Sequence, residues 1–151
     1  MNKRLVLDVI FDPQYLRNGY KKVLLDMYKK KFEKRCTNDG YIVNINRIHM
    51  IKSSHLTNNN EIDMISVCEC DIIKPEIDME VECIIDMIHV NGIFVNICGI
   101  KMLIPNSDDY EYYNEYFVYN NNKYIIGDKI NVKIKNVRYD RYMYTCIGNL
   151  I

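Results

Sequence analysis

The sequence predicts an α+β domain followed by an all-β domain, and three observations support this. A β-prone run near the start is followed by a helical pattern and then by further β-prone runs. From about residue 77 onward, apolar and polar side chains alternate in short segments. The chain has 151 residues, 48% of them apolar and 26% charged, which suits one modest domain or two small ones. We therefore expect domains at 1–76 and 77–151.

The first domain is predicted to run strand, helix, strand, strand. Residues 4–11 form the first strand, which Asp12 and Pro13 end because proline offers no N–H to a ladder. Residues 20–35 repeat apolar side chains at helical spacing, and we interpret their lysine-rich face as solvated, with a basic partner surface as the alternative. The remaining elements are a strand at 41–45 with a candidate extension at 47–51, a polar loop at 52–60 and a strand at 61–73.

The second domain is predicted to hold five short strands. In the clearest of them Ile130, Val132 and Ile134 alternate with polar side chains, and Asn91–Gly92 is a strong hairpin signal. An acidic, tyrosine-rich excursion at 106–122 separates the third strand from the fourth. The expected strands cover 79–90, 93–97, 100–104, 129–135 and 142–147, with turns at 98–99 and 136–141. This order is typical of a five-stranded OB barrel, whose closure removes exposed sheet edges.

No pattern in the sequence predicts catalysis, a metal site or a cofactor. The cysteines include no C-x-x-C pair, the histidines no H-x-x-x-H pair and the glycines no phosphate-binding spacing. We interpret Cys68 and Cys70 as reduced, buried side chains. No stretch approaches the roughly 20 apolar residues of a membrane helix, and the charged N-terminus is unlike a signal peptide, so we expect neither membrane insertion nor secretion. Zero formal net charge argues against a general nucleic-acid coat but not against a local basic patch.

Two segments of the second domain resemble the S-one type OB domain, named for a ribosomal protein. Gly-Ile-Phe-Val at 92–95 is followed by a strand that ends at Pro105, and Ile-Gly-Asp-Lys-Ile at 126–130 resembles the fourth-strand signature. The resemblance implies a barrel whose outer face contacts single-stranded RNA. Asn91 and Pro105 stand where many RNA-binding members have an aromatic ring and a histidine.

The first domain narrows the resemblance to one family. The strand that ends at Phe11, the run Asp-Pro-Gln-Tyr-Leu at 12–16, the helix and Gly-Tyr-Ile-Val at 40–43 resemble the tip domain of the seventh-subunit family of RNA polymerase II, which has an archaeal counterpart. Members join the tip to an OB domain through a strand ending in Lys-Pro, as Lys74-Pro75 does here. Abundant Asn, Ile, Lys and Tyr without Ala or Trp suggest a divergent copy from an AT-rich genome, viral or protist.

The resemblance implies a non-catalytic stalk subunit of a DNA-dependent RNA polymerase. The implied partners are core subunits, a smaller stalk subunit, and nascent single-stranded RNA or initiation factors at the OB domain. The implied location is intracellular, wherever the polymerase acts: the nucleus, or the cytoplasm or virion for a virus. The positions that the resemblance assigns to contact with the core are Asp12, Pro13, Gln14, Gly40, Tyr41, Arg47 and His49, with the region up to residue 60.

Basic and aromatic residues gather near the end of the chain. Cations that follow phosphates and rings that stack on bases are the parts of single-strand binding. The alternative is a solvated barrel face with tyrosines packed beneath lysine stems. The candidate RNA-contact residues are Phe94, Lys101, Lys129, Lys133, Lys135, Arg138, Tyr139, Arg141 and Tyr142.

Other functions stay open on the sequence. A freestanding OB-fold RNA-binding protein, in translation or RNA decay, would share the second domain but would not need the first. A stalk subunit that makes no RNA contact is a variant of the main hypothesis. An enzyme would need a carboxylate cluster or metal ligands, which the sequence does not supply. The acidic run at 108–115 would repel RNA and fits a basic protein or solvent better.

Overall fold

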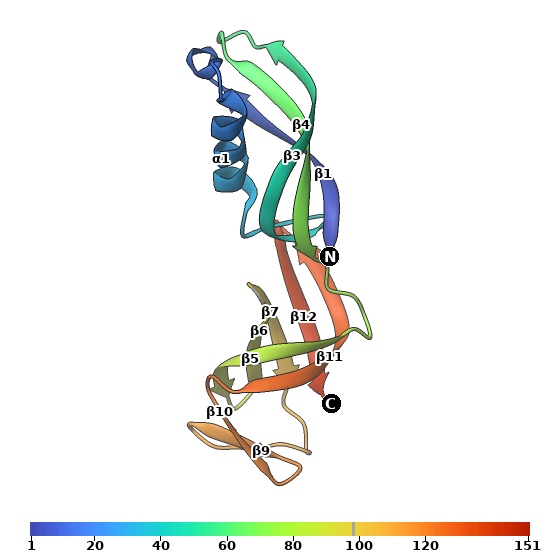
Figure 1. Cartoon of the computed structure of the whole chain (residues 1–151). Helices are drawn as coiled ribbons and strands as arrows, with labels where there is room; N and C mark the ends of the chain where they lie inside the picture. The colour runs from blue at the N-terminus through green and yellow to red at the C-terminus, as the bar shows by residue number, and fades with distance from the viewer. Residues whose placement is uncertain (98) are drawn as a thin grey trace. The chain divides into compact units, whose positions relative to one another are not determined.

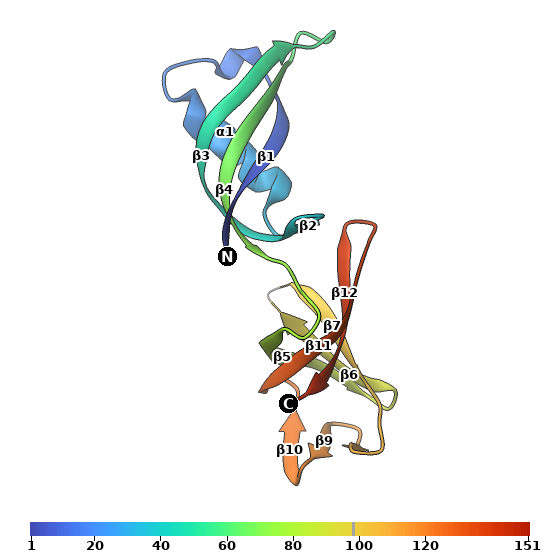
Figure 2. The same cartoon turned by 90° about the vertical axis from the view of Figure 1, so that its right-hand side faces the viewer.

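The structure is a computed structural model that describes residues 1–97 and 99–151. It divides into two compact units, an N-terminal unit at Met1–Ile73 and a barrel unit at Lys74–Ile151. The division falls three residues before the expected boundary after residue 76. Figures 1 and 2 show an α+β unit and an all-β unit, as the sequence predicts.

The N-terminal unit is an antiparallel sheet with a helix against one face. Its order along the sheet is β1-β4-β3-β2, so the first and last long strands are neighbours. Helix α1 lies on one face and leaves the other face of the sheet uncovered (Figure 1). The elements are β1 (Asn2–Phe11), the 3-10 helix η1 (Pro13–Tyr15), α1 (Tyr20–Phe32), β2 (Arg35–Thr37), β3 (Gly40–Leu56) and β4 (Ile62–Ile73).

Alternation in the two neighbouring strands builds the core of this unit. In β1 every second residue from Leu5 to Phe11 is buried, and in β4 every second residue from Met64 to Ile72 is buried. Leu24 and Tyr28 of α1 complete this core, both with no exposed surface. The predicted strand-helix-strand-strand order is therefore confirmed, with the short strand β2 added.

Strand β3 is longer than the sequence indicates. Residues 52–56, expected in a polar loop, continue β3 opposite β4. Four register shifts interrupt the pairing and leave Val43, Asn46, His49 and Lys52 without a direct partner. Each shift reverses the side-chain alternation, because an extra residue is added on one strand only. This explains why a period-2 pattern cannot be followed along β3.

The barrel unit is a closed five-stranded barrel in the order β11-β12-β7-β6-β5. Pairing of β11 with β5 closes it, and β12 pairs with β7 in parallel. The excursion between the third and fourth barrel strands forms a small antiparallel sheet of its own, β10-β9-β8. The bounds are β5 (Glu80–His89), β6 (Gly92–Ile97), β7 (Ile100–Pro105), β8 (Glu111–Tyr112), β9 (Tyr116–Tyr119), β10 (Asn122–Ile125), β11 (Lys129–Asp140) and β12 (Met143–Leu150).

The sequence misplaced one turn of the barrel unit. Residues 136–140, expected in a turn, extend β11 after a register shift at Lys135. The actual turn is Arg141–Tyr142, where both residues have positive φ, +50° and +60°. A two-residue hairpin usually has Asn-Gly at such positions, so Arg-Tyr provides no recognisable turn signal. The turn expected at 98–99 includes Cys98, which lies outside the described residues.

Candidate nucleic-acid and partner interfaces

Three of the nine candidate RNA-contact residues share the outer surface of the barrel. Lys101 of β7 pairs with Thr145 of β12, which pairs with Arg138 of β11. Phe94 of β6 pairs with Leu103, two residues along β7 from Lys101. Side chains at paired and diagonal positions of one face lie within reach of each other. Phe94, Lys101 and Arg138 therefore belong to one surface.

Lys129 and Lys133 lie on another part of the outer surface, where β11 runs beside β5 and its glutamates. Lys129 Nζ is 3.7 Å from a carboxylate oxygen of Glu82 on β5. Lys133 pairs with Glu80 of the same strand. The side chain of Lys135 is exposed at the register shift of β11. The alternation in the sequence correctly places these three lysines on the outside of the barrel. Lys129 forms an ion pair with Glu82, and Lys133 has Glu80 as its cross-strand neighbour.

The remaining candidates lie at the closed end of the β11–β12 hairpin, which extends beyond the rest of the barrel (Figure 2). Tyr139 is half-buried against Tyr144, with ring centroids 4.8 Å apart. Tyr144 is 5% exposed, so this pair fits the packing alternative rather than a stacking platform. Arg141 and Tyr142 are exposed at the turn, and Tyr142 has 79% of its surface accessible.

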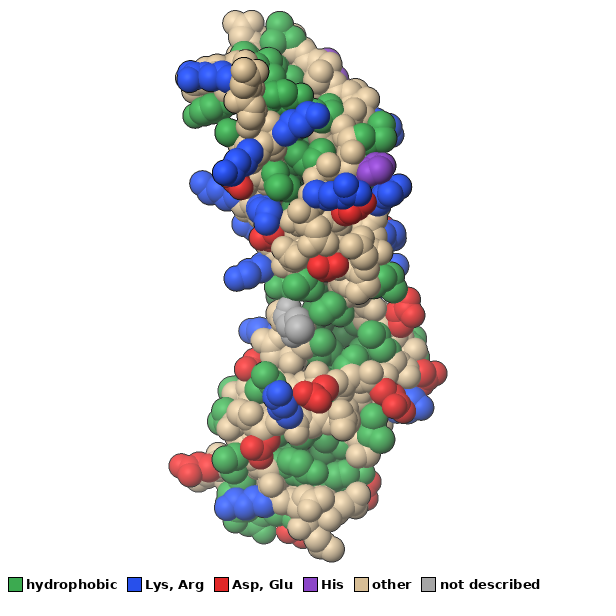
Figure 3. Space-filling view, in the orientation of Figure 1, with side chains coloured by type: hydrophobic (Ala, Val, Ile, Leu, Met, Phe, Trp, Pro, Cys, Tyr) green, Lys and Arg blue, Asp and Glu red, His purple; other side chains and the backbone are tan. Residues whose placement is uncertain are grey.

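Charge is divided unequally between the two units. The N-terminal unit has 12 Lys and Arg against 9 Asp and Glu, a formal charge of +3. The barrel unit has 8 against 11, a formal charge of −3. In Figure 3, blue side chains gather over the N-terminal unit and red ones over the barrel unit. The barrel unit therefore has no overall positive excess, so phosphate binding there would depend on a local group of cations.

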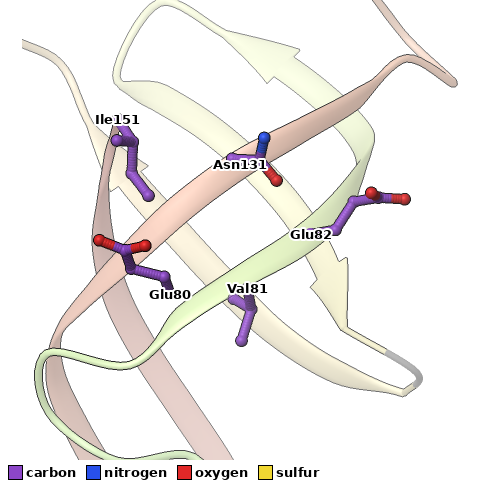
Figure 4. A pocket seen from close by; sticks show the side chains of 5 residues that line it. All are labelled: Glu80, Val81, Glu82, Asn131 and Ile151. Carbon is purple, nitrogen blue, oxygen red and sulfur yellow. The ribbon is translucent and has the colours of Figure 1, made fainter.

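A hollow on the barrel unit is lined by acidic and polar side chains. It has a volume of about 400 Å³ and is lined by Glu80, Val81, Glu82, Asn131 and Ile151. Figure 4 shows Glu80 and Glu82 on β5, with Val81 between them pointing the opposite way, as strand alternation requires. No group of three or more metal-ligating side chains occurs among residues 1–97 and 99–151. The hollow thus has two carboxylates, and the described residues around it do not add a third Asp, Glu, His or Cys side chain.

The sequence missed the aromatic cluster of the β8–β10 sheet. Tyr113 stacks on Tyr116 with centroids 4.6 Å apart, and Lys123 Nζ lies 4.2 Å from the centroid of Tyr116. Phe117 is fully buried and stacks on Tyr124 at 5.0 Å. The tyrosines of the excursion therefore build a small core, a role that the tyrosine content of 106–122 could have indicated.

Among the candidate partner residues, Asp12, Pro13 and Gln14 form the 3-10 helix η1 and its N-cap. The Asp12 carboxylate accepts a hydrogen bond from the backbone N–H of Gln14 at 3.0 Å and another from Gln14 Nε2 at 3.2 Å. Pro13 occupies the first helical position, where its missing N–H costs nothing. All three are exposed, so local structure and partner contact are compatible roles for them.

Gly40 and Tyr41 have structural roles at the start of β3. Gly40 has φ +137°, and a Cβ there would lie 3.0 Å from the Ile73 carbonyl oxygen. Tyr41 is 8% exposed and pairs with Ile73 and Cys36. Both residues hold the start of β3 against β4 and offer little surface to a partner.

Arg47 and His49 surround one carboxylate on the uncovered sheet face. Arg47 Nε and Nη2 each donate to Glu69 at 2.8 Å, and Arg4 Nε lies 3.6 Å and His49 Nδ1 3.9 Å from Oε1 of the same side chain. The hydrogen bonds from Arg47 lower the pKa of Glu69 and raise the pKa of Arg47. This four-residue cluster is a feature that the sequence did not predict, because bulges in β3 hide the register.

The candidate partner residues do not form one patch. Arg47 pairs with Glu69, which pairs with Arg4, whereas η1 follows Phe11 at the far end of β1. About seven residues of strand separate these positions, about 23 Å at about 3.3 Å per residue. The structure thus places Asp12–Gln14 at one end of the sheet, Arg47 and His49 along it, and Gly40 and Tyr41 toward the other end.

Exposed apolar side chains accompany η1 at its end of the sheet. Tyr15 is 44% exposed, Leu16 50% and Leu56 66%. Leu56 and Phe11 both pair with Ile62, and Tyr15 contacts Phe11 with ring centroids 6.0 Å apart. We name Gln14, Tyr15, Leu16 and Leu56 the sheet-end patch. Of this patch, Gln14 was named as a candidate from the sequence, and Leu56 lies within the candidate region up to residue 60.

The buried cysteines are unreactive thiols. Burial raises the pKa of Cys68 to about 12 and the pKa of Cys70 and Cys146 to about 11. Because the thiolate is the nucleophile and the metal ligand, these side chains are inert at neutral pH. Cys36, Cys68, Cys70, Cys83 and Cys146 are all free.

Comparison of the sequence with protein-family models finds no matching family, and comparison with curated proteins finds no match. None of the helices among residues 1–97 and 99–151 is both long and apolar enough to cross a lipid bilayer. Observations on the molecule itself therefore support the functional argument: a four-stranded sheet with one helix, followed by a closed OB-like barrel.

Proposed function

We propose that this chain is a non-catalytic stalk subunit of a DNA-dependent RNA polymerase. The observation that carries the proposal is the order of its two units: an antiparallel sheet with one helix, then Lys74-Pro75, then an OB-like barrel with an excursion between its third and fourth strands. A freestanding OB protein would need no N-terminal unit. The N-terminal unit docks on the polymerase core, and the barrel unit contacts nascent RNA or an initiation factor.

The sheet-end patch is the part of the N-terminal unit that best suits docking. Leu16 and Leu56 expose at least half of their surfaces, although the core of the same unit is well packed. Apolar side chains grouped on a surface mark protein contacts more often than scattered ones do. Gln14 and Tyr15 add polar groups beside them.

A paired substitution tests the docking step. The double variant Leu16→Asp, Leu56→Asp is expected to lose the large polymerase subunits when the tagged chain is purified from its source. The matched control is Ile126→Asp, which changes an exposed isoleucine (56% accessible) in the barrel unit. Mass spectrometry measures the amount of large subunit per tagged chain. Equal recovery with all variants would remove the sheet-end patch from the proposal.

A further inference from the structure

Paired strands align four apolar side chains in one row across the outside of the barrel. Met87 of β5 pairs with Phe94 of β6, Phe94 with Leu103 of β7, and Leu103 with Ile147 of β12. Paired residues point to the same side of a sheet. Met87 is 47% and Ile147 39% exposed, and Phe94 and Leu103 are half-buried. We name these four residues the apolar row.

A second row with two cations runs beside it. The pairs Ile84–Asn96, Asn96–Lys101, Lys101–Thr145 and Thr145–Arg138 continue from strand to strand. We name Asn96, Lys101, Thr145 and Arg138 the polar row; Ile84, at its β5 end, is apolar and 47% exposed. Lys101 makes no ion pair with any described residue, and Arg138 lies 3.4 Å from Asp140 on its own strand. The face formed by both rows is thus apolar along one line, with Lys101 and the Arg138–Asp140 pair along one edge.

This face is poorly suited to single-stranded RNA. Stacking needs aromatic rings, and Phe94 is the only ring in either row. Phosphate binding needs a continuous positive groove, but the two rows hold only two cations, and Arg138 lies beside Asp140. Methionine, leucine and isoleucine instead gain free energy by burial against other apolar side chains.

The geometry points to a protein partner: we propose that the two rows form a docking face for an amphipathic helix with carboxylates along one side. Neighbouring strands are about 4.8 Å apart, close to the helical pitch of about 5.4 Å, so successive turns of a helix crossing the strands meet successive side chains of the apolar row. The carboxylates of the helix then face Lys101 and Arg138. The anchors of such a helix lie at i, i+3 or i+4, and i+7, the spacing by which amphipathic helices are recognised.

This docking proposal rests on the proposed stalk function in one respect. Of the two contacts proposed for the barrel unit, it selects a protein such as an initiation factor over RNA. The argument from the two rows stands on the barrel unit alone. A binding test on the purified full chain is therefore independent of whether the chain co-purifies with a polymerase.

The test compares three probes by fluorescence anisotropy on the full chain. The first is an amphipathic peptide of about 14 residues, or about four helical turns, with a leucine stripe flanked by glutamates. The second has lysines in place of the glutamates, and the third is a single-stranded oligouridylate. We expect the glutamate peptide to bind at least about tenfold more tightly than the lysine peptide, because only it complements Lys101 and Arg138.

Substitutions assign the binding to the face. Met87→Ser with Ile147→Ser is expected to weaken binding of the glutamate peptide about tenfold, and Ile126→Ser to leave it unchanged. Lys101→Glu is expected to weaken binding of the glutamate peptide similarly. Lys135→Glu, a matched charge reversal outside both rows, is expected to leave this binding unchanged. All five positions are exposed, so these changes spare the core.

Two results would overturn the proposal. One is tight binding of oligouridylate that Lys101→Glu and Lys135→Glu weaken equally, with no preference for the glutamate peptide, which would assign the barrel to RNA. The other is equal binding of both peptides, or equal effects of the face variants and their controls, which would leave the face without a docking role.

Discussion

A buried tyrosine hydroxyl joins three elements of the N-terminal unit. Tyr28 of α1 donates a hydrogen bond to the Met64 carbonyl oxygen of β4 at 2.8 Å. Its hydroxyl also lies 2.9 Å from Ser66 Oγ and 3.3 Å from the Leu7 carbonyl oxygen of β1. Burial raises the pKa of Tyr28 to about 12. Ser66 is fully buried, so this hydroxyl is the partner that makes its burial tolerable.

Tyr28→Phe is therefore expected to destabilise the protein by about 1–3 kcal/mol, because it leaves the Ser66 hydroxyl without its partner. Urea unfolding followed by circular dichroism measures the change. Tyr15→Phe, at a 44% exposed position of the same unit, is the control and should be near neutral. Equal stability of the two variants would show that the buried hydrogen bonds contribute nothing.

The cluster around Glu69 predicts a response to acid. Hydrogen bonding from Arg47 lowers the pKa of Glu69, with further lowering from Arg4 and His49. A carboxyl with a folded pKa below its unfolded one adds stability above the unfolded pKa and loses it as the pH falls through the folded pKa. Arg47→Gln should raise the pKa of Glu69 and reduce this loss on acidification below about pH 4.

Titration of the Glu69 carboxyl by NMR checks this prediction directly. Arg47→Lys is the matched variant, since it keeps the charge and loses the two-pronged hydrogen bond. Its Glu69 pKa should lie between the pKa values of the wild type and Arg47→Gln. The same Glu69 titration curve in all three proteins would contradict the assignment of the shift to Arg47.

At the scale of a single strand, close packing inside the barrel explains why β12 has a glycine at position 148. A Cβ at Gly148 of β12 would contact Met102 Sδ, and would lie 2.7 Å from Val132 Cγ1 and 2.9 Å from the Lys133 carbonyl oxygen. Gly148→Ala is thus expected to cost about 1–3 kcal/mol through overpacking, measured as a lower unfolding midpoint. Asn149→Ala, at the exposed neighbouring position, should change stability little. A neutral Gly148→Ala would mean that β12 can shift without cost.

The turn of the β11–β12 hairpin is strained by its side chains. Arg141 and Tyr142 both have positive φ, which costs non-glycine residues about 1 kcal/mol or more each. Arg141→Asn with Tyr142→Gly should therefore stabilise the protein by about 1 kcal/mol, because Asn-Gly suits this turn. Thermal unfolding measures the gain. A lower melting temperature would show that the tyrosine at the turn contributes packing that offsets its strain.

An element could be predicted from the sequence where its apolar and polar residues alternate without interruption. The alternation Ile130, Val132, Ile134 predicted a strand whose inner face is buried, and the structure confirms it. The same reasoning failed along β3, where an added residue at four places reverses the alternation. It failed again at the β11–β12 turn, which uses neither glycine nor asparagine. Bulges and unusual turns are set by neighbouring strands, which a local pattern does not contain.

The candidate sites were less predictable than the fold, for a related reason. Sequence positions identified exposed cations correctly, but their partners come from other strands, such as Glu82 beside Lys129. The apolar row was invisible for the same reason, since its four residues come from four strands. Sites assembled across a sheet need the register, and the register became known only with the structure.

At the scale of the whole molecule, the two units carry opposite formal charges, +3 and −3. The excursion at 106–125 holds four acids and one lysine, so it accounts for the whole negative excess of the barrel unit. The remainder of the barrel is neutral, which favours contacts made through shape and apolar side chains over general attraction to nucleic acid. This division of charge agrees with a protein that works by docking.

Stoichiometric co-purification tests the proposed stalk function most directly. The tagged full chain is isolated from its native source, washed in moderate salt, and the bound proteins are quantified by mass spectrometry. The proposal predicts large polymerase subunits in nearly equal amounts to the tagged chain, retained through the wash. Recovery of the chain alone, or with ribosomal components in place of polymerase subunits, would contradict it and favour a freestanding OB-fold protein.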